Sequence, residues 1–390
     1  MTPHFKIAIA ATAGLVGGSA AVASQADQKP ANAAAVVAEE APVALLVDMT
    51  SGQTLFAKNE DRRFIPASIT KVMSAYVAFE MIKSGELDLR QQFTMSPAVA
   101  TDWYRTGSTM FLEEGEAVEV DLLIKGITSV SANDASAVLA EGAAGSVDQW
   151  VNRMNETAAS LGMRNSHFGT PNGWPDGGKT FTTARDLELL AKAMISRHPD
   201  LYARYFGKEG LRHNGFAQAN HDPISGRVDG ADGIKTGYTN QAGNGFLGSA
   251  AREGARLILV LAAVDDEPTR GNAARQMIEW GFAGYDRQSV FTAGQTIARA
   301  QVQNGEASLV GLKTAADVSI AVPIGDTAPR VVSVLYDGPL EAPIRSGERV
   351  ARLTISGGNM PPANIELYAA EDVAEAGHFT RISNAFESWF

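Results

Sequence analysis

The stretch Pro66-Ala67-Ser68-Ile69-Thr70-Lys71-Val72-Met73 leads into an apolar run that ends at Gly85, and this pattern predicts a buried helix. A serine in the first turn of a helix lies beside free backbone N–H groups and the positive end of the helix dipole. Lys71 follows three residues later on the same face, so its amine can reach the Ser68 hydroxyl. Serine and lysine so placed form a nucleophile and a general base. The alternative is a capping serine with a solvated lysine, which the apolar surroundings of Lys71 disfavour.

Two further short motifs supply polar groups that such a pair needs. Ser131-Ala132-Asn133 lies where one predicted helix ends and the next begins, so its hydroxyl and amide can point into a cleft. By itself this segment is also typical of a capping turn. Lys235-Thr236-Gly237 lies on a predicted edge strand, where we expect Gly237 to allow the close approach of a ligand backbone. Ser-x-x-Lys, Ser-x-Asn and Lys-Thr-Gly, in this order, are the signature of penicillin-recognising serine enzymes.

With these motifs the chain resembles a serine D-Ala-D-Ala carboxypeptidase, a low-molecular-mass penicillin-binding protein. The resemblance extends from Ala44-Leu45-Leu46-Val47-Asp48, through the motifs, to Trp280-Gly281-Phe282. It implies an α/β catalytic domain of the serine β-lactamase and DD-peptidase type, with an antiparallel sheet and helices, and a small C-terminal all-β domain. It also implies that the enzyme needs no cofactor and no metal, and that its partners are D-Ala-D-Ala stem peptides of peptidoglycan and β-lactam antibiotics.

The resemblance assigns roles to nine residues, which are Ser68, Lys71 and Ser131 in catalysis and Asn133, Lys235, Thr236, Gly237, Tyr238 and Arg270 in substrate binding. Ser68 would attack the carbonyl between two D-alanines, and Lys71 would take its proton. Ser131 would then relay the proton to the leaving amine. Lys235 and Thr236 would bind the terminal carboxylate of the substrate.

The resemblance also bears on the oxyanion hole, on Arg270 and on the segment 218–223. The backbone N–H groups of Ser68 and Tyr238 would form the oxyanion hole; many relatives have histidine at the second position, which changes the pocket shape but not the N–H. Arg270, at the start of a predicted helix, would add a carboxylate contact. Residues 218–223 differ from an arginine-bearing version in some relatives, so the trimming preference stays open.

Hydrophobic periodicity outlines the rest of the chain. We expect a strand hairpin over 42–57, helices over 121–128, 134–142 and 147–162, a helix from the capping box Thr183-x-x-Asp186 to 196, strands over 245–250 and 256–264, and a helix over 269–280. The expected organisation is a signal peptide over 1–23, a disordered leader over 24–41, a catalytic domain over 42–284, a small β domain over 285–370 and an amphipathic helix over 371–390.

The two ends of the chain predict export and a membrane contact. Lys6, a short apolar core and Ala21-Val22-Ala23 are typical of a signal peptide with its cleavage site. Near the C-terminus, Phe379, Ile382, Phe386, Trp389 and Phe390 recur at helical spacing. We therefore expect a periplasmic protein held at the outer face of the inner membrane by an interfacial helix. The alternative is a helix that docks on the β domain.

Composition excludes several other classes of protein. The net charge is −11 and no lysine- and arginine-rich run is present, which disfavours nucleic acid as a partner. The chain has no cysteine, which excludes disulfides and thiolate chemistry. Its six histidines show no zinc-binding spacing.

The segment 173–180, Gly-Trp-Pro-Asp-Gly-Gly-Lys-Thr, matches the phosphate-loop pattern of nucleotide-binding enzymes. A phosphate loop follows a buried strand and opens directly into a helix. Residues 165–169 are not typical of such a strand, Pro175 interrupts the loop, and the next helix is capped only at Thr183. We therefore do not expect nucleotide binding.

Other functions on the same fold remain as alternatives. A class A β-lactamase would carry a glutamate in the neighbourhood of 166–171, which has none. A DD-endopeptidase would share all three motifs, so the sequence does not separate it from a carboxypeptidase. A non-catalytic penicillin-binding sensor is disfavoured because the reactive side chains are intact.

Overall fold

The structure is a computed structural model that describes residues 5–9 and 40–377. These residues form two compact units. The first comprises 40–47 and 55–282, and the second comprises 5–9, 48–54 and 283–377. Within the described ranges, no helix combines the length and apolarity needed to cross a membrane.

The first unit is organised around a five-stranded sheet in the order β3-β2-β10-β9-β8. Its strands are β2 (Val43–Asp48), β3 (Gln53–Lys58), β8 (Ala231–Thr239), β9 (Gly243–Arg252) and β10 (Ala255–Val264). β9 pairs antiparallel with both β8 and β10. Residues 257–261 of β10 are all buried, as expected of a central strand that is covered on both faces. The predicted assembly of one sheet from distant parts of the chain is confirmed.

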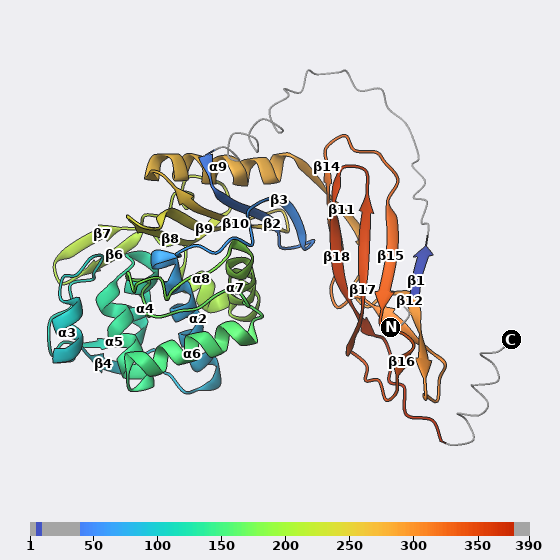
Figure 1. The fold of residues 1–390 in the computed structure, drawn as a ribbon, viewed down its shortest axis with the longest axis horizontal. Coiled ribbons are helices and arrows are strands. Elements are labelled where there is room, and N and C mark those ends of the chain that lie inside the picture. Colours follow the sequence, from blue (N-terminus) through green and yellow to red (C-terminus); the bar gives the residue numbers. More distant parts are fainter. Residues whose placement is uncertain (1–4, 10–39, 378–390) are drawn as a thin grey trace. The chain divides into compact units, whose positions relative to one another are not determined.

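Helices cover both faces of this sheet (Figure 1), with α9 on one face and the other helices on the opposite face. The helices are η1 (Ala67–Ile69, a 3-10 turn), α2 (Thr70–Ser84), α3 (Pro97–Trp103), α4 (Val120–Ser129), α5 (Asn133–Ala144), α6 (Val147–Ser160), α7 (Ala184–Arg197), α8 (Pro199–Tyr205) and α9 (Glu267–Ala283). Two small two-stranded sheets pair β4 (Gln92–Thr94) with β5 (Ala117–Glu119) and, as a hairpin, β6 (Gly210–His213) with β7 (Phe216–Ala219).

Helix α2 is the central helix, as its apolar run predicts. Its residues from Thr70 to Phe79 are all buried, and it ends at Gly85, which has the left-handed φ of 81° typical of a helix C-terminus. The cap predicted for α7 is also present, since the Thr183 hydroxyl accepts a hydrogen bond from the Asp186 N–H at 3.1 Å.

The second unit is almost entirely β, as predicted. A seven-stranded sheet has the order β1-β15-β17-β18-β13-β12-β16, with bounds β1 (Phe5–Ile9), β12 (Thr296–Gln303), β13 (Leu309–Lys313), β15 (Val331–Tyr336), β16 (Leu340–Glu341), β17 (Arg349–Gly357) and β18 (Met360–Ala369). A separate pair joins β11 (Tyr285–Phe291) to β14 (Val318–Pro323). Along β15, Val332 and Val334 enter the core while Val331 and Leu335 stay exposed, which is the alternation of a half-buried strand.

The turn 48–54, which we placed within the catalytic domain, belongs to this second unit. The buried side-chain amide of Gln53 bonds to the backbone of Ala321 in β14 as a neighbouring strand would. Its nitrogen donates to the Ala321 carbonyl at 2.9 Å, and its oxygen accepts from the Ala321 N–H at 2.6 Å. The Arg287 guanidinium also pairs with the Asp48 carboxylate at 3.1 Å. These contacts satisfy buried polar groups that the hairpin pattern did not reveal.

The predicted C-terminal helix is wrong for residues 371–377, which are extended. Val373 and Ile344 exchange two backbone hydrogen bonds of 2.9 Å, and the Ala376 N–H donates to Asn304 at 2.8 Å. These bonds to distant partners replace the local bonds of a helix. The remainder of that helix, the predicted leader up to residue 39 and most of the predicted signal peptide lie outside the described residues. The exception is β1, which pairs antiparallel with β15.

Candidate active site

The structure brings Ser68 and Lys71 into direct contact at the junction of η1 and α2. Lys71 is only 1% exposed. Its Nζ lies 2.8 Å from each of three oxygens: Ser68 Oγ, Asn133 Oδ1 and the backbone carbonyl of Asn172. The first two contacts join residues that the motifs predict. The third was missed, because a backbone carbonyl has no signature in the sequence.

These three contacts orient the amine of Lys71. The amide oxygen of Asn133 and the carbonyl of Asn172 can only accept hydrogen bonds, so each takes one N–H of the amine. A neutral amine has two N–H groups and one lone pair, and the lone pair is therefore directed at the Ser68 hydroxyl. Burial lowers the pKa of Lys71 well below its usual value; the Lys235 charge lowers it further and Asp134 opposes the shift. The arrangement suits an amine that accepts the serine proton.

Ser131 lies between α4 and α5 and Asn133 begins α5, where the sequence predicts the end of one helix and the start of the next. Ser131 has a φ of 63°, a strained conformation for a serine, and it lines the cavity beside Ser68. Asn133 is fixed on both sides: its N–H donates to Ser108 at 2.8 Å and its Nδ2 donates to Thr106 at 3.1 Å. The Asn133 amide therefore presents its oxygen to Lys71 in a single orientation.

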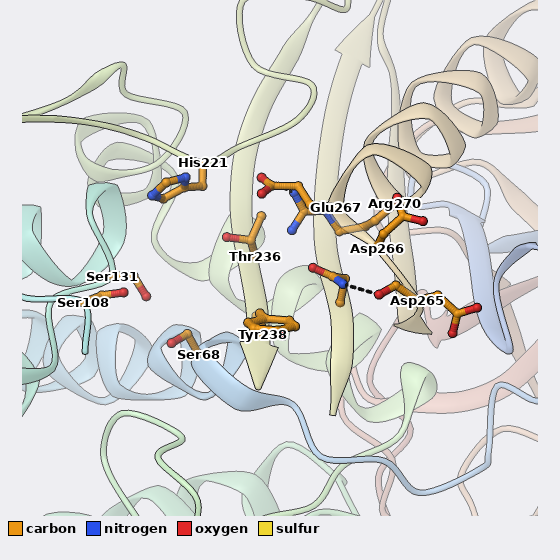
Figure 2. A pocket seen from close by; sticks show the side chains of 12 residues that line it. Ser68, Ser108, Ser131, His221, Thr236, Tyr238, Asp265, Asp266, Glu267 and Arg270 are labelled. Carbon is orange, nitrogen blue, oxygen red and sulfur yellow. Dashed lines mark hydrogen bonds and ion pairs between the residues drawn. The ribbon is translucent and has the colours of Figure 1, made fainter. Parts of the chain in front are cut away.

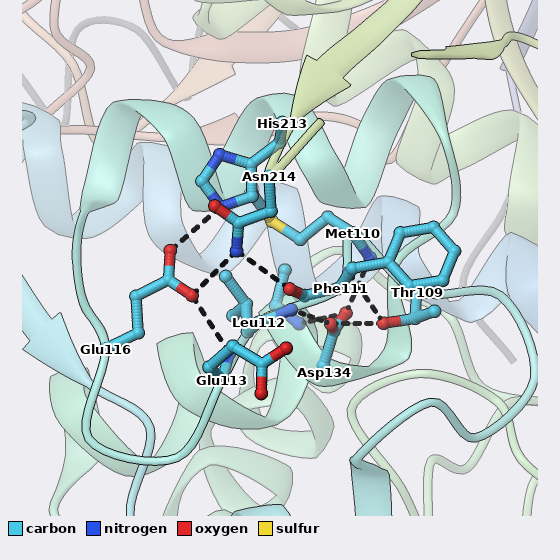
Figure 3. Close-up of polar contacts among 10 residues, drawn as sticks. Thr109, Met110, Phe111, Leu112, Glu113, Glu116, Asp134, His213 and Asn214 are labelled. Carbon is cyan, nitrogen blue, oxygen red and sulfur yellow. Dashed lines mark hydrogen bonds and ion pairs between the residues drawn. The ribbon is translucent and has the colours of Figure 1, made fainter. Parts of the chain in front are cut away.

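The loop over 106–116, whose Thr106 and Ser108 carbonyls bind Asn133, is itself held in place by hydrogen bonds (Figure 3). The buried Asp134 carboxylate accepts from the Met110 and Leu112 N–H groups at 3.1 Å each, and also from the Thr109 hydroxyl. On the outer side of the loop, Glu116 contacts the β6–β7 hairpin, with its carboxylate 2.9 Å from both His213 Nε2 and Asn214 Nδ2. The hairpin and the start of α5 thus hold the loop between them.

Strand β8 carries the third motif on the edge of the sheet, as predicted. The reason for Gly237 differs from our expectation. A side chain there would place its Cβ 2.4 Å from the Pro66 carbonyl oxygen and 3.2 Å from the Ile69 nitrogen. Gly237 therefore lets β8 approach the turn that carries Ser68, rather than a ligand. This close approach brings Thr236 and Tyr238 to the cavity next to Ser68.

Near Thr236, the charges of two buried cations, Lys235 and Arg270, act on each other. Lys235 is buried, and its Nζ donates to the Thr236 carbonyl at 3.1 Å. Arg270 reaches the same region from α9 and is also buried, with its Nη2 3.1 Å from Glu267 Oε1. Burial lowers the pKa of Lys235 to about 7; Asp222 opposes this shift and the Arg270 charge adds to it. The geometry fits the predicted carboxylate site, because planar carboxylates pair well with guanidinium and ammonium groups.

Ser68, Ser131, Thr236 and Arg270 all border one cavity of about 490 Å³ (Figure 2). It is lined by Ser68, Ser108, Ser131, His221, Thr236, Gly237, Tyr238, Asn244, Asp265, Asp266, Glu267 and Arg270. Lys71, Asn133 and Lys235 are buried and are not among the lining residues, but Lys71 contacts Ser68 and Lys235 precedes Thr236. Ser108, Asn244 and the acidic run 265–267 were not predicted. Only Glu267 had a local signal, since it precedes Arg270 by one helical turn.

The segment 170–174 forms the floor under Lys71. The Pro171 carbonyl accepts from the Ser74 hydroxyl at 2.6 Å, and the next carbonyl, of Asn172, holds Lys71. The segment that matches a phosphate loop therefore starts inside this floor. It does not open into a helix, because α7 begins only at Ala184.

Gly173 is essential to this floor. Its φ is 76°, and an added Cβ would lie 1.8 Å from the Ala67 carbonyl oxygen. We expect Gly173→Ala to lower the free energy of unfolding by about 2–4 kcal/mol through backbone strain and overpacking. Gly177→Ala is the matched control. It has a φ of 74° but nothing within 4 Å, so only the strain of about 1 kcal/mol remains. Equal unfolding midpoints in denaturant for the two variants would contradict this account.

Comparisons with known proteins agree with this geometry. The family of D-alanyl-D-alanine carboxypeptidases of the peptidase S11 type matches residues 27–265, and the penicillin-binding protein 5 C-terminal domain matches 285–375. D-alanyl-D-alanine carboxypeptidase DacC of Escherichia coli is 32% identical over 356 residues, which cover 89% of this chain and 88% of the relative. DacF of Bacillus subtilis is 29% identical over 362 residues, covering 90% of this chain and 91% of the relative.

Solved structures extend the likeness to the fold. Penicillin-binding protein 5 from Haemophilus influenzae has a TM-score of 0.75 at 29% identity, covering 86% of this chain and 98% of its own. Penicillin-binding protein D2 from Listeria monocytogenes, in the ampicillin-bound form, has a TM-score of 0.54 at 26% identity, covering 62% and 97%. The family match, the relatives and the Ser68–Lys71 geometry together show that this chain belongs to the D-alanyl-D-alanine carboxypeptidases, serine hydrolases among the low-molecular-mass penicillin-binding proteins.

Proposed function

We propose that this carboxypeptidase removes the terminal D-alanine of peptidoglycan stem pentapeptides through an acyl-enzyme on Ser68, with Lys71 as the general base. The observation that carries the proposal is the set of three 2.8 Å contacts of the Lys71 amine. Two of its partners are pure acceptors, which leaves the lone pair of the neutral amine for the Ser68 proton.

The reaction has two halves. The Ser68 O–H bond breaks as its proton passes to Lys71, and Oγ bonds to the carbonyl carbon between the D-alanines. The resulting oxyanion is stabilised by the backbone N–H groups of Ser68 and Tyr238. The C–N bond then breaks, Ser131 relays the proton to the leaving nitrogen, and D-alanine departs. Water finally hydrolyses the ester, which returns the proton to Ser68.

Carboxylate recognition accounts for the choice of a C-terminal residue as the leaving group. Thr236 and Arg270 line the cavity together with Ser68 (Figure 2), and the buried Lys235 precedes Thr236 on β8. A substrate whose free carboxylate binds the cations places its last peptide bond at the serine. Asn133 binds the amide of the preceding residue. A DD-endopeptidase substrate also carries a carboxylate beside the scissile bond, so it is the second candidate.

β-Lactams are expected to acylate the same serine, in line with the ampicillin-bound relative. Deacylation of that adduct is expected to be slow. The carboxylates that line the cavity are Asp265, Asp266 and Glu267. The segment under Lys71, where a class A β-lactamase would carry its glutamate, instead offers the Asn172 carbonyl. A carbonyl cannot take a proton from water, so the site lacks the water-activating carboxylate of a class A β-lactamase and the penicilloyl ester should persist longer than in such an enzyme.

The direct test uses the full chain and a pentapeptide that ends in D-Ala-D-Ala, with free D-alanine as the readout. The matched substrate has a C-terminal amide. Release from the acid and a much slower reaction of the amide are expected, together with one penicilloyl adduct on Ser68 by mass spectrometry. Rapid penicillin turnover would favour the β-lactamase alternative, and an adduct without D-alanine release would favour a sensor.

The cellular role that we propose is cell-wall maturation and maintenance of cell shape at the outer face of the inner membrane. The support is the signal-peptide pattern over 1–23 and the aromatic periodicity over 376–390. Fractionation of cells that express the full chain, or the chain ending at residue 375, tests this. Export of both proteins is expected, with only the full chain in the membrane pellet. Identical fractionation would show that the segment is not an anchor.

A pH profile tests the two lysines together. The Lys71 amine must be neutral, so acylation is expected to rise with pH through its lowered pKa. Lys235 is protonated below its pKa of about 7 and loses its charge above it. For the free acid, kcat/KM should therefore be bell-shaped, with an alkaline limb near pH 7. The amide should lack that limb, since it presents no carboxylate. Identical profiles for the two substrates would contradict the role of Lys235.

A further inference from the structure

We propose that Glu267 is an internal competitor for the substrate carboxylate, whose side chain occupies the cationic end of the cavity and is displaced when the peptide binds. The inference deepens the proposed function and rests on it, because it concerns the same carboxylate site. It makes Glu267 a specificity-determining residue that no sequence motif includes.

The first argument is the unequal burial of the two partners. Arg270 Nη2 lies 3.1 Å from Glu267 Oε1, and the arginine side chain is 4% exposed while the glutamate side chain is 62% exposed. In Figure 2 the Glu267 carboxylate and the Arg270 guanidinium lie together next to Thr236. The cation is therefore fixed in the protein, whereas the carboxylate is free to rotate into solvent.

The second argument is the unused capacity of the site. Arg270 Nε is buried and has no hydrogen-bond partner within the described ranges. A guanidinium presents its N–H groups in a fork that matches both oxygens of a carboxylate. Glu267 contacts only Nη2, so a ligand that binds Nε and Nη2 together would make a better pair. A buried donor without a partner is unfavourable, and such a ligand would satisfy it.

The third argument is the charge balance. Lys235 Nζ donates to the Thr236 carbonyl, and no salt bridge joins it to a carboxylate of the described chain. The charge of Asp222 acts on both cations, and the carboxylate that pairs directly with Arg270 at this end is that of Glu267. A bound substrate carboxylate takes its place, so binding exchanges one carboxylate for another. The exchange weakens the apparent affinity for acids, while a C-terminal amide carries no charge to compete for Arg270.

The test is Glu267→Gln in the full chain, assayed with the D-Ala-D-Ala peptide and with its amide. Loss of the competing charge is expected to lower the KM of the acid about fivefold, the fold-change that corresponds to one partly exposed ion pair. The change is expected in KM rather than in kcat, because Glu267 does not contact Ser68 or Lys71. The KM of the amide should fall less than that of the acid.

Asp266→Asn is the matched control. Asp266 lines the same cavity, but its Oδ1 accepts from the Thr269 N–H at 2.8 Å and its Oδ2 accepts from the Thr269 hydroxyl at 2.9 Å. Asparagine can keep the first bond through its amide oxygen, and its Nδ2 can donate to the Thr269 hydroxyl oxygen in place of the second. Less than about a twofold change in KM is expected, as for loss of a screened surface charge. This variant separates the specific contact with Arg270 from a general loss of negative charge.

Each outcome decides a different point. An unchanged or increased KM in Glu267→Gln would overturn the inference, because Glu267 would then be inert or would orient Arg270. An equal fall in both variants would also overturn it in favour of general electrostatics. If the wild-type chain releases no D-alanine, the proposed function fails independently of either variant. An acid KM that falls only in Glu267→Gln supports the internal competitor.

Discussion

Ser68→Ala is expected to abolish both D-alanine release and covalent labelling by penicillin, a loss on the order of 10⁶-fold when a serine nucleophile is removed. In the described chain, the Lys71 amine is hydrogen-bonded to one hydroxyl group, that of Ser68. Its other two partners are the Asn133 amide oxygen and the Asn172 carbonyl. Mass spectrometry of the penicillin-treated variant is the direct measurement.

The fold of this variant should be intact. The N-terminus of α2 has no side-chain cap, so Ser68 makes no capping bond that the change would remove. Lys71 keeps two of its three partners. We therefore expect the free energy of unfolding to change by no more than about 1 kcal/mol. Persistent labelling of a folded Ser68→Ala protein would show that another residue is the nucleophile.

Lys71→Met is expected to reduce the rate of acylation about 10²–10⁴-fold, the usual contribution of a general base. Methionine has a similar length but no lone pair of matching basicity, so the Ser68 proton has no acceptor. The loss should appear in the acylation rate by penicillin, followed in stopped flow. Destabilisation by about 1–3 kcal/mol is expected as well, because Asn133 Oδ1 and the Asn172 carbonyl lose their donor.

Lys71→Arg separates these two effects. A guanidinium can donate to both acceptors but does not give up its proton in proteins, so it restores hydrogen bonds without restoring a base. We expect it to be as slow as Lys71→Met while recovering part of the stability. Rapid acylation by Lys71→Arg would show that Lys71 acts only as a structural cation. A wild-type rate in both variants would exclude Lys71 from proton transfer altogether.

The sequence by itself determined the features that depend on local spacing. Ser68 and Lys71 are one helical turn apart, so any helix over this stretch places them on one face. Gly85 ends α2 and Thr183 starts α7 because their conformational and capping preferences act within a few residues. The three motifs and their order were enough to predict the family and the fold class.

Contacts between distant segments required the tertiary structure. Asn172 holds Lys71 through a backbone carbonyl, a group that every residue has, so no residue type marks it. Gly237 is required by the Pro66 carbonyl rather than by a ligand. Gln53 belongs to the second unit because its amide bonds with Ala321.

The limits of the hydrophobic pattern explain why the sequence predicts local features but not contacts between distant segments. A hydrophobic pattern tells which face of a helix or strand is buried, but not which group it meets there. The Lys71 site joins residues that are 3, 62 and 101 positions apart, and only the first separation is short enough for local structure to decide it. Residues 371–377 are extended for the same reason, since hydrogen bonds to Asn304 and Ile344 outweigh a weak local helix preference. The chemistry was thus determined by the sequence of the motifs, whereas the buried partners that set the pKa and orientation of each group were decided by packing.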